Sequence, residues 1–451
     1  MDINEIKYYY DLISEYTLKL ENNKLSISDL ENIKKKIKYL ESMIDVYFKI
    51  VFKLGSILDY NELYKKGFNE SDILNFKRSD DEYLENCLKT LKDNQKNHDY
   101  MFGYPANMVD FSYFTKYLKY LETKLYYMNN CGDPKEIGNY LMDNKKNELA
   151  IIEMFKKNLN LTDYSGYITT GGTEGNIQGI NLGFLKYPNG TLYYSKDAHY
   201  SILKANYQNK EEINTVNSKI DVNSLLEKIV LNYKKNKSPA IIVLTYGTTK
   251  TGSIDNIELI KKILTTLNIP FYIHVDAALY GGIPSNQVNS PRLDFKSLDV
   301  DSISISMHKY LGVSRTNGVL LLKETIKDNF IDYIGQNDTT LSGSRDFLAF
   351  STYQIVNEMF NRCDKFAYIN NIIYFTNLLK NNEIKYMKGN NLGNIFIVEK
   401  PSDEICKKYQ LATFTENDKE YAHIIIFSFH QKEVMEELIN DLKKAKKLIK
   451  E

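Results

Sequence analysis

A lysine that follows a short strand-like segment is the residue of this sequence with the clearest chemical meaning. Residues 302–306 (Ser-Ile-Ser-Ile-Ser) are predicted to form a strand, and Met307, His308 and Lys309 follow directly. Burial would lower the pKa of the Lys309 amine, because removal from water disfavours its charged form. A neutral lysine amine can form an imine with an aldehyde. Considered alone, a lysine that only reaches solvent from a strand end is the more common arrangement.

An aspartate ends another predicted strand upstream of this lysine. The strand covers residues 271–275, and Asp276-Ala277-Ala278 follows it. A carboxylate at this position can pair with the protonated nitrogen of a pyridine-type cofactor ring, which keeps the ring able to accept electrons. A single aspartate at a strand end is more often a helix N-cap. Its combination with Lys309 favours the cofactor role.

A glycine-rich segment is the third candidate. Residues 169–176 (Thr-Thr-Gly-Gly-Thr-Glu-Gly-Asn) lie between a predicted strand and a helix expected to begin near Gly175. Small residues with free backbone N–H groups at a helix N-terminus bind anions, and Thr173 adds a hydroxyl. The segment fits a phosphate group. It is not a Walker A loop, because no Gly-Lys-Ser/Thr follows, and it lacks the spacing of the dinucleotide-binding fingerprint.

Two more predicted strand ends carry polar side chains. His199 follows the strand 191–194, and its flat ring can stack on an aromatic cofactor. Thr248 and Thr249 follow the strand 240–245 and offer hydroxyl groups. Each feature alone is weak, since a strand-end histidine is more often a structural hydrogen-bonding residue. Together they place a phosphate site, a stacking ring, a hydroxyl, a carboxylate and a lysine after successive strands.

These side chains require an open, mostly parallel α/β sheet to bring them together. Short apolar segments that suit strands buried on both faces are followed by helical segments: 167–169, 191–194, 240–245, 271–275, 302–306 and 318–322. In such sheets, ligands bind beyond the carboxyl ends of the strands. We therefore predict a helical N-terminal arm (1–95), a large cofactor-binding domain (96–345) and a small C-terminal α+β domain (346–451) with strands near 394–398 and 423–429.

Composition limits the expected partners and location. The 58 basic and 58 acidic side chains give a net charge of zero, so no global field favours nucleic acid or an anionic membrane. The N-terminus is acidic without a following apolar run, which argues against a signal peptide, and the longest apolar stretches are strand-sized. The four cysteines form no close pair that suggests a disulfide or a metal site: Cys87, Cys131, Cys363 and Cys406. We expect a soluble, cytoplasmic protein without a metal.

At these motifs the chain resembles the group II amino-acid decarboxylases that depend on pyridoxal 5′-phosphate (PLP). Within them it is similar to the branch of bacterial histidine decarboxylase and plant serine decarboxylase. The matching segments are 103–105, 129–133, 166–176, 192–201, 247–249, 274–278, 308–309 and 343–345. The resemblance runs from about residue 100 to 350 and is weaker toward the C-terminus. It implies the fold type I architecture of PLP-dependent transferases, with a mostly parallel central sheet flanked by helices, and a homodimer.

Carried over position by position, the resemblance also implies roles for individual residues. Lys309 would bind the cofactor aldehyde, Asp276 would pair with the pyridine nitrogen, and His199 would stack on the ring. Relatives use a mobile loop with a tyrosine that helps to protonate the substrate carbanion, and Tyr333 lies where such a tyrosine could be. The remaining cofactor contacts implied are Gly172, Thr173, Thr249, Ala278, Ser306 and His308. Of these, Gly172, Thr173 and Ser306 would hold the phosphate.

The implied reaction is decarboxylation of an L-amino acid to its amine and CO₂. Segment 192–201 favours histidine, giving histamine, whereas segment 103–107 leans toward serine, giving ethanolamine. A different reaction on the same scaffold, such as that of a lyase, desulfurase or aminotransferase, is an alternative; an aminotransferase normally needs an arginine for the substrate carboxylate, and Arg345 alone stands beside a matched motif. A non-catalytic homologue would be expected to lack Lys309 or Asp276.

Two segments depart from the pattern of the branch. Residues 313–317 (Val-Ser-Arg-Thr-Asn) replace a turn that contains cysteine and proline, and Asp346-Phe347-Leu348 replaces Asn-Gly-His. Both segments are expected near the site. They weaken the transfer of substrate identity more than the transfer of reaction type.

Overall fold

The computed structural model describes residues 85–86, 89–90, 97–107, 130–139, 145–294, 299–323, 329–346 and 348–448. The chain divides into two compact units between Asn97 and His98, and the fold below belongs to the second unit. The predicted arm (1–95) lies outside the described residues except for 85–86 and 89–90, as does Cys87. The predicted domain boundaries remain predictions.

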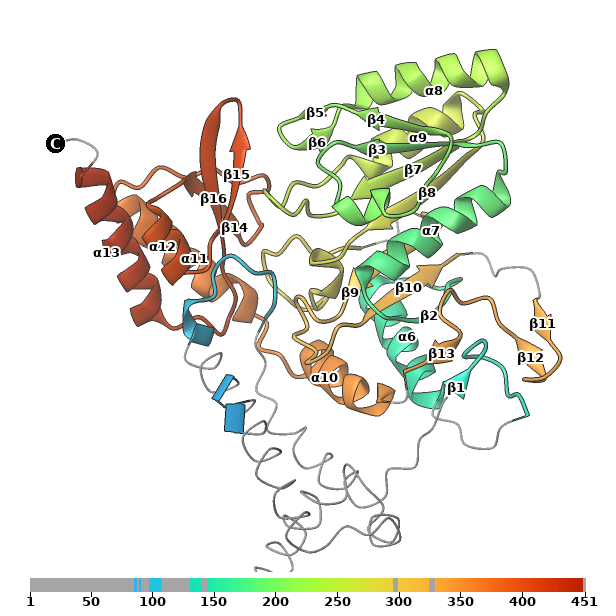
Figure 1. The fold of residues 1–451 in the computed structure, drawn as a ribbon, viewed down its shortest axis with the longest axis horizontal. Coiled ribbons are helices and arrows are strands. Elements are labelled where there is room, and N and C mark those ends of the chain that lie inside the picture. The colour runs from blue at the N-terminus through green and yellow to red at the C-terminus, as the bar shows by residue number, and fades with distance from the viewer. Residues whose placement is uncertain are drawn as a thin grey trace, which may run out of the picture. The chain divides into compact units, whose positions relative to one another are not determined.

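The centre of the second unit is a seven-stranded sheet with the order β2-β10-β9-β8-β7-β3-β4 (Figure 1). Its strands are β2 (Ser165–Thr169), β3 (Thr191–Ser195), β4 (Lys210–Ile213), β7 (Ala240–Thr245), β8 (Phe271–Asp276), β9 (Ser302–Ser306) and β10 (Gly318–Leu322). The run from β9 to β4 is parallel, and β10 is antiparallel to both of its neighbours. The predicted mostly parallel sheet is confirmed, and each predicted strand of this domain lies within an observed one.

Helices cover both faces of this sheet, as the continuous apolar strands predicted. Alternate side chains of β7 pack into two different cores. Ile241 and Val243 pack into the core under α7 (Gly172–Lys186), whereas Ile242 and Leu244 pack into the core on the opposite face. The second core also contains side chains of several helices, among them α6 (Lys145–Leu159), α8 (Val222–Asn236), α9 (Ile257–Thr266) and α10 (Ala349–Asn361). Full burial of both strand faces fixes the sheet between two layers.

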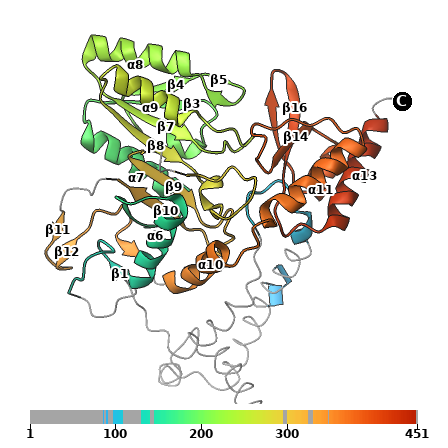
Figure 2. The same ribbon diagram turned by 180° about the vertical axis from the view of Figure 1, so that it is seen from behind.

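The C-terminal part adds a small antiparallel sheet with the order β14-β16-β15, which lies to one side of the large sheet together with α11 and α13 (Figure 2). Its elements are β14 (Ile395–Glu399), β15 (Ala412–Glu416), β16 (Lys419–Ile425), α11 (Ala367–Asn381), α12 (Asp403–Lys408) and α13 (Lys432–Leu448). The predicted strand 423–429 is therefore placed too late. Beyond Ile425 the chain turns, and the Phe427 N–H donates to His430 Nδ1 instead of to a neighbouring strand.

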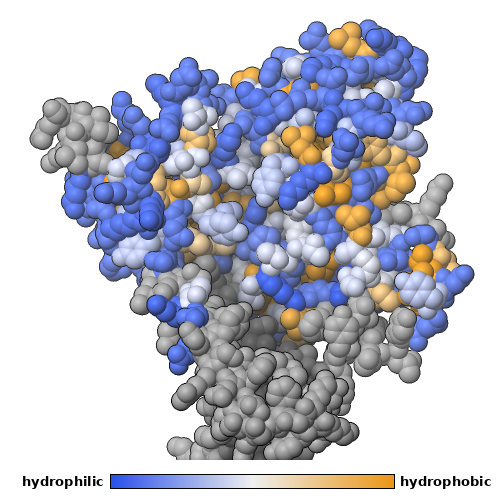
Figure 3. Space-filling model, in the orientation of Figure 1, coloured by the Kyte–Doolittle hydropathy of each residue, from blue (hydrophilic) through white to orange (hydrophobic). Residues whose placement is uncertain are grey.

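The remaining described elements are short. They are η1 (His98–Tyr100), η2 (Tyr200–Leu203), η3 (Tyr280–Gly282), and the two-stranded pairs β1 (Asn130–Cys131) with β13 (Ser344–Arg345), β5 (Thr215–Val216) with β6 (Lys219–Ile220), and β11 (Phe330–Ile331) with β12 (Gln336–Asn337). The described surface over α8 and α13 is mainly hydrophilic (Figure 3). No helix in these ranges combines the length and apolar character that a membrane span needs.

Helix α7 packs unusually close to the sheet because glycines line the face that meets it. A Cβ on Gly175 would lie 2.3 Å from Ser304 Oγ, and a Cβ on Gly179 would lie 2.2 Å from His274 Nδ1. Real Cβ atoms do not come this close to other atoms. Because these glycines have no side chain, α7 lies directly against β8 and β9 at His274 and Ser304.

Gly179→Ala is accordingly expected to destabilise the fold by about 1–3 kcal/mol, the usual cost of overpacking a core. His274 cannot move aside cheaply, because both of its ring nitrogens are hydrogen-bonded. Urea denaturation monitored by circular dichroism measures the change. Leu185→Ala serves as the control, since Leu185 lies on the same helix and is 68% exposed. Equal stabilities of the two variants would contradict the close-packing argument.

Candidate active site

A cavity of about 490 Å³ lies where the carboxyl ends of β7, β8 and β9 meet the start of α7 and the C-terminal sheet. This volume is in the range of ordinary small-molecule sites. The predicted site residues that line the cavity are His199, Asp276, Lys309, Gly172, Thr173, Thr249, Ala278, Ser306 and His308. The structure therefore brings together every predicted site residue except Tyr333.

Tyr333 lies elsewhere, in the turn between β11 and β12. Its side chain is 77% exposed and does not line the cavity of the described chain. The turn is held by Asn139, whose Nδ2 donates to the Tyr333 carbonyl. The role of Tyr333 remains a prediction.

Lys309 has a fixed backbone and a free amine. Its N–H donates to the Ser306 carbonyl at 3.2 Å, and its own carbonyl accepts from the Asn107 N–H at 2.8 Å. Burial lowers the pKa of the Lys309 amine, and the charge of Asp276 opposes this shift. Among the described residues no group makes a hydrogen bond or ion pair with Nζ. The arrangement suits an amine that is to react with a carbonyl compound.

Asp276 ends β8 and is almost fully buried. Its Oδ1 accepts from the Ala278 N–H at 3.1 Å, and its Oδ2 accepts from Asn176 Nδ2 at 2.9 Å. Asn176 Oδ1 in turn accepts from His274 Nε2 at 3.0 Å. Sequence reasoning missed Asn176 and His274. Two signals were available: His274 and Asp276 are two residues apart on one strand and share a face, and Asn176 follows Gly172 by one helical turn.

His274 makes the stability of the protein sensitive to acid. Burial lowers the pKa of its imidazole from 6.5 to about 4. As the pH falls, this histidine therefore binds a proton near pH 6.5 in the unfolded chain but only near pH 4 in the folded chain. Stability from this group is complete above pH 6.5 and is lost as the pH falls toward 4, by about 1.4 kcal/mol per pH unit.

We expect the urea-unfolding free energy of the wild type to fall more steeply between pH 6.5 and 4.5 than that of His274→Gln, which keeps a side-chain N–H donor but does not titrate. Comparison of the two slopes removes the contributions of all other groups. Identical slopes would show that His274 is not the acid-sensitive group.

His199 lies at the cavity wall as the N-cap of η2. Its Nδ1 accepts from the Ser201 N–H at 3.2 Å and lies 2.8 Å from Ser201 Oγ. Burial lowers the pKa of the His199 ring, with the charge of Asp276 acting in the opposite direction and that of Lys309 adding to the decrease. The ring is therefore neutral near pH 7, as suits a flat group that stacks on a cofactor.

The start of α7 forms an open anion cradle. The helix begins at Gly172, not near Gly175 as predicted, so the paired glycines belong to its cap and first turn. Gly171 has φ +154° and no side chain to cap the helix, and a Cβ at Gly172 would lie 2.4 Å from Ser306 Oγ. A Cβ on Gly171 would meet nothing within 4 Å, so space is open beside the backbone N–H groups of this first turn. With the hydroxyls of Thr173 and Ser306 they fit a phosphate monoester.

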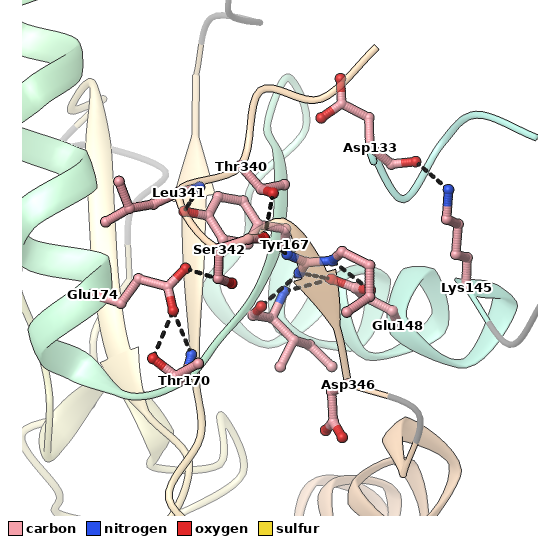
Figure 4. A network of polar contacts seen from close by, with 12 residues as sticks. Asp133, Lys145, Glu148, Tyr167, Thr170, Glu174, Thr340, Leu341, Ser342 and Asp346 are labelled. Atoms are coloured by element: carbon pink, nitrogen blue, oxygen red, sulfur yellow. Dashed lines mark hydrogen bonds and ion pairs between the residues drawn. The ribbon is translucent and has the colours of Figure 1, made fainter. Parts of the chain in front are cut away.

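The same turn is braced from its other side by Glu174. Its Oε2 accepts from both the backbone N–H and the Oγ1 of Thr170 at 2.7 Å, and its Oε1 accepts from Ser342 Oγ at 3.2 Å (Figure 4). Glu174 is the third residue of the helix, and it holds the residue that precedes the cap Gly171. This contact explains why α7 begins earlier than its glycine content suggested.

Arg345 has a structural role. Its guanidinium forms a buried ion pair with Glu148, donates to the Ile168 carbonyl at 2.6 Å and lies over the Tyr167 ring, 4.8 Å from the ring centroid. Figure 4 shows Glu148 and Tyr167 in this network. Arg345 therefore joins α6, β2 and β13, and it is not free to hold a substrate carboxylate.

The two segments that depart from the expected pattern meet in space. Arg315 forms an ion pair with Asp346, and Arg315 Nη2 also donates to Thr352 Oγ1 at 3.2 Å. Thr316 lines the cavity next to this pair. The two departures therefore pair with each other at the edge of the site.

Comparison with known proteins agrees with this geometry. A family model described as the pyridoxal-dependent decarboxylase conserved domain matches residues 187–357. A histidine decarboxylase of Solanum lycopersicum is 33% identical over 393 residues, which cover 83% of this chain and 91% of the relative. Serine decarboxylase 2 of Oryza sativa subsp. japonica is 33% identical over 344 residues, covering 72% of this chain and 70% of the relative. The structure of L-methionine decarboxylase from Streptomyces sp. 590 has the same fold, with a TM-score of 0.65 at 19% identity, and the match covers 84% of this chain and 96% of that structure.

The sheet, the cradle and the buried lysine define a fold type I enzyme whose cofactor is PLP. The chain belongs to the PLP-dependent amino-acid decarboxylases, in the branch of the histidine decarboxylases and plant serine decarboxylases. It is a carboxy-lyase. The family, fold class and cofactor predicted from the sequence are thereby confirmed.

Proposed function

We propose that this enzyme converts L-histidine to histamine and CO₂. The observation that carries the proposal is the convergence of Lys309, Asp276 and His199 on one cavity beside an open phosphate cradle. The choice of histidine is supported by the likeness to the histidine decarboxylases of Solanum lycopersicum and Pseudomonas entomophila, both 33% identical.

Each of these residues has a distinct task in the proposal. The backbone at Gly172 and the hydroxyls of Thr173 and Ser306 bind the phosphate, and Lys309 holds the cofactor through Nζ. When bound, PLP supplies a ring that takes up the charge left by departing CO₂. Asp276 keeps a proton on the ring nitrogen.

Further residues of the proposed site orient the ring and complete the reaction. His199 would stack on the ring, and Thr249 and Ala278 would lie beside it. His308 contacts the phosphate or the reacting substrate. Burial lowers the pKa of His308, so its ring enters the reaction neutral.

A homodimer in the cytoplasm is the proposed form of the enzyme. In that form Tyr333 is proposed to reach the active site of the second subunit and to donate the proton that replaces CO₂. Its 77% exposure leaves the phenol accessible for such a contact.

Serine is the alternative substrate, because rice serine decarboxylase 2 is also 33% identical. An aminotransferase has less support, since among the described residues the two arginines near the cavity, Arg315 and Arg345, are both paired with carboxylates.

Incubation of the PLP-loaded enzyme with each common L-amino acid tests the proposal, with CO₂ and amine measured together. Histamine and CO₂ from histidine alone are the expected result. Ethanolamine from serine alone would replace the first substrate with the second. No CO₂ from any amino acid would contradict the proposal as a whole.

A further inference from the structure

We propose that Asn176 is a positioning residue that orients two groups of the site at once, the carboxylate of Asp276 and the ring of His199. The inference rests on the role proposed above for Asp276 as partner of the cofactor nitrogen. It adds a residue of α7, and behind it His274 and Ser302, to the machinery.

The hydrogen bonds around Asn176 have only one consistent direction. Asn176 Nδ2 lies 2.9 Å from Asp276 Oδ2 and 2.9 Å from Ser201 Oγ, and its Oδ1 lies 3.0 Å from His274 Nε2. A carboxylate can only accept, so the amide nitrogen must face Asp276. If the amide were turned over, its oxygen would face the carboxylate oxygen at the same distance, and the two would repel.

This orientation sets the protonation of His274. Because Asn176 Oδ1 accepts, His274 carries its proton on Nε2, and its Nδ1 accepts from Ser302 Oγ at 2.7 Å. Burial lowers the pKa of this ring to about 4, which keeps it neutral. His274 and Ser302 are completely buried, and Asn176 nearly so. The hydrogen bonds therefore run in one direction, from Ser302 through His274 and Asn176 to Asp276. Water has no access to these groups and cannot reverse that direction.

A branch of the same chain fixes His199. Ser201 Oγ accepts from Asn176 Nδ2, so its own hydrogen points to His199 Nδ1, 2.8 Å away. Nδ1 also accepts from the Ser201 N–H at 3.2 Å. His199 is therefore held as the tautomer with its proton on Nε2. One amide thus orients the groups proposed to contact the edge and the face of the cofactor ring.

The close packing of α7 explains why a short amide can reach both partners. A Cβ on Gly175 would meet Ser304 Oγ at 2.3 Å, and a Cβ on Gly179 would meet His274 Nδ1 at 2.2 Å. These glycines flank Asn176 along the helix. With larger residues in their place, α7 would stand further from the sheet, and the amide would not span the gap.

Asn176→Ala in the PLP-loaded enzyme tests the inference. We expect the dissociation constant of PLP to rise about 10- to 100-fold, by analogy with the losses seen when residues that orient metal ligands are removed. We also expect the visible absorption band of the bound cofactor to change its pH dependence, and kcat to fall more than KM changes.

The control is Asn158→Ala. Asn158 is a similarly buried asparagine that bridges the Ile283 carbonyl and the Ser285 N–H away from the cavity. It is expected to lower stability without changing the cofactor band.

Asn176→Asp is a second variant with almost the same shape, so that folding is preserved. Its new carboxylate would lie against Asp276, and when both groups are charged they repel, which also raises the pKa at which the pair takes up a proton. The titratable groups that face Asp276 in the described chain, His199, His274 and Lys309, are unchanged. We expect the cofactor band of Asn176→Asp to differ from the wild type at pH 8 and to approach it near pH 5, where the introduced group is protonated and donates again.

Asp276→Asn distinguishes a failure of the positioning role of Asn176 from a failure of the role proposed for Asp276. If Asp276→Asn leaves PLP affinity and the band unchanged, the role of Asp276 fails, and the inference fails with it. If Asp276→Asn changes both while Asn176→Ala and Asn176→Asp match the wild type, only the positioning role of Asn176 is overturned. Equal effects of Asn158→Ala and Asn176→Ala on the band would also overturn it.

Discussion

Lys309→Ala is expected to lower the rate of CO₂ release by at least about 1,000-fold, on the order of the losses seen when a catalytic nucleophile is removed. The reason is that Lys309 Nζ is the amine proposed to hold the cofactor, and its pKa is lowered by burial. Loss of the side chain removes that attachment while the cradle at Gly172 stays in place. Bound PLP should therefore still be found, without covalent attachment to the chain.

Borohydride reduction followed by peptide mapping provides the direct measurement. In the wild type the cofactor should be fixed to Lys309, and in Lys309→Ala to no residue. Lys388→Ala is the matched control, because burial also lowers the pKa of Lys388, to about 8, but this lysine lines a separate groove. Its removal should leave activity unchanged. Reduction that labels another lysine, or an active Lys309→Ala enzyme, would contradict the assignment.

The position of the site could be predicted from the sequence because parallel strands end at one edge of a sheet. Asp276 ends one buried strand, Lys309 follows another within a few residues, and His199 follows a third. The sheet brings these ends together regardless of the details of the loops. The strands themselves were visible because burial on both faces requires continuous apolar segments.

The network behind Asp276 could not be predicted in the same way. Asn176 reaches Asp276 and Ser201 only because α7 packs against β8 and β9 at close range, and this register depends on tertiary contacts of Gly175 and Gly179. A sequence pattern shows that a helix face is glycine-rich, but not which strand residues it meets.

Two features of the C-terminal sheet also escaped the sequence reasoning. Strand β15 (Ala412–Glu416) is mostly exposed and polar, so it lacks the apolar signal of a buried strand. The apolar run from Ile424 to Phe427 suggested a strand that continues past residue 425. Instead the chain turns there, and the Phe427 N–H donates to the buried His430. Both departures arise from tertiary contacts that override local pattern.

The pairing of Arg315 with Asp346 shows a further limit. Each residue is an unexplained departure when the sequence is read as separate motifs, and the two are far apart in the chain. The structure makes them partners, so either change alone would leave a partly buried charge without a counter-ion. Sequence reasoning could place both near the site but could not pair them.

The largest effect on stability is expected at the ion pair between Arg345 and Glu148. Both side chains are at most 1% exposed, and Glu148 Oε1 also accepts from the Ile168 N–H at 2.7 Å. Removal of one partner leaves a buried charge without compensation, which typically costs about 3–5 kcal/mol. We therefore expect Arg345→Leu and Glu148→Leu each to lower the urea-unfolding free energy by about this amount.

The double variant Arg345→Leu/Glu148→Leu should lose much less than the sum of the two single variants, because it leaves no unpaired charge, and the cycle measures the coupling. Arg362→Leu is the control: its pair with Glu358 is largely exposed and lies one turn along α10, so its loss should cost only about 0.5 kcal/mol. If the single variants at the buried pair were as mild as this control, Arg345 would not be a structural clamp. It would then be free to serve the substrate carboxylate, and the argument against an aminotransferase would lose its strongest support.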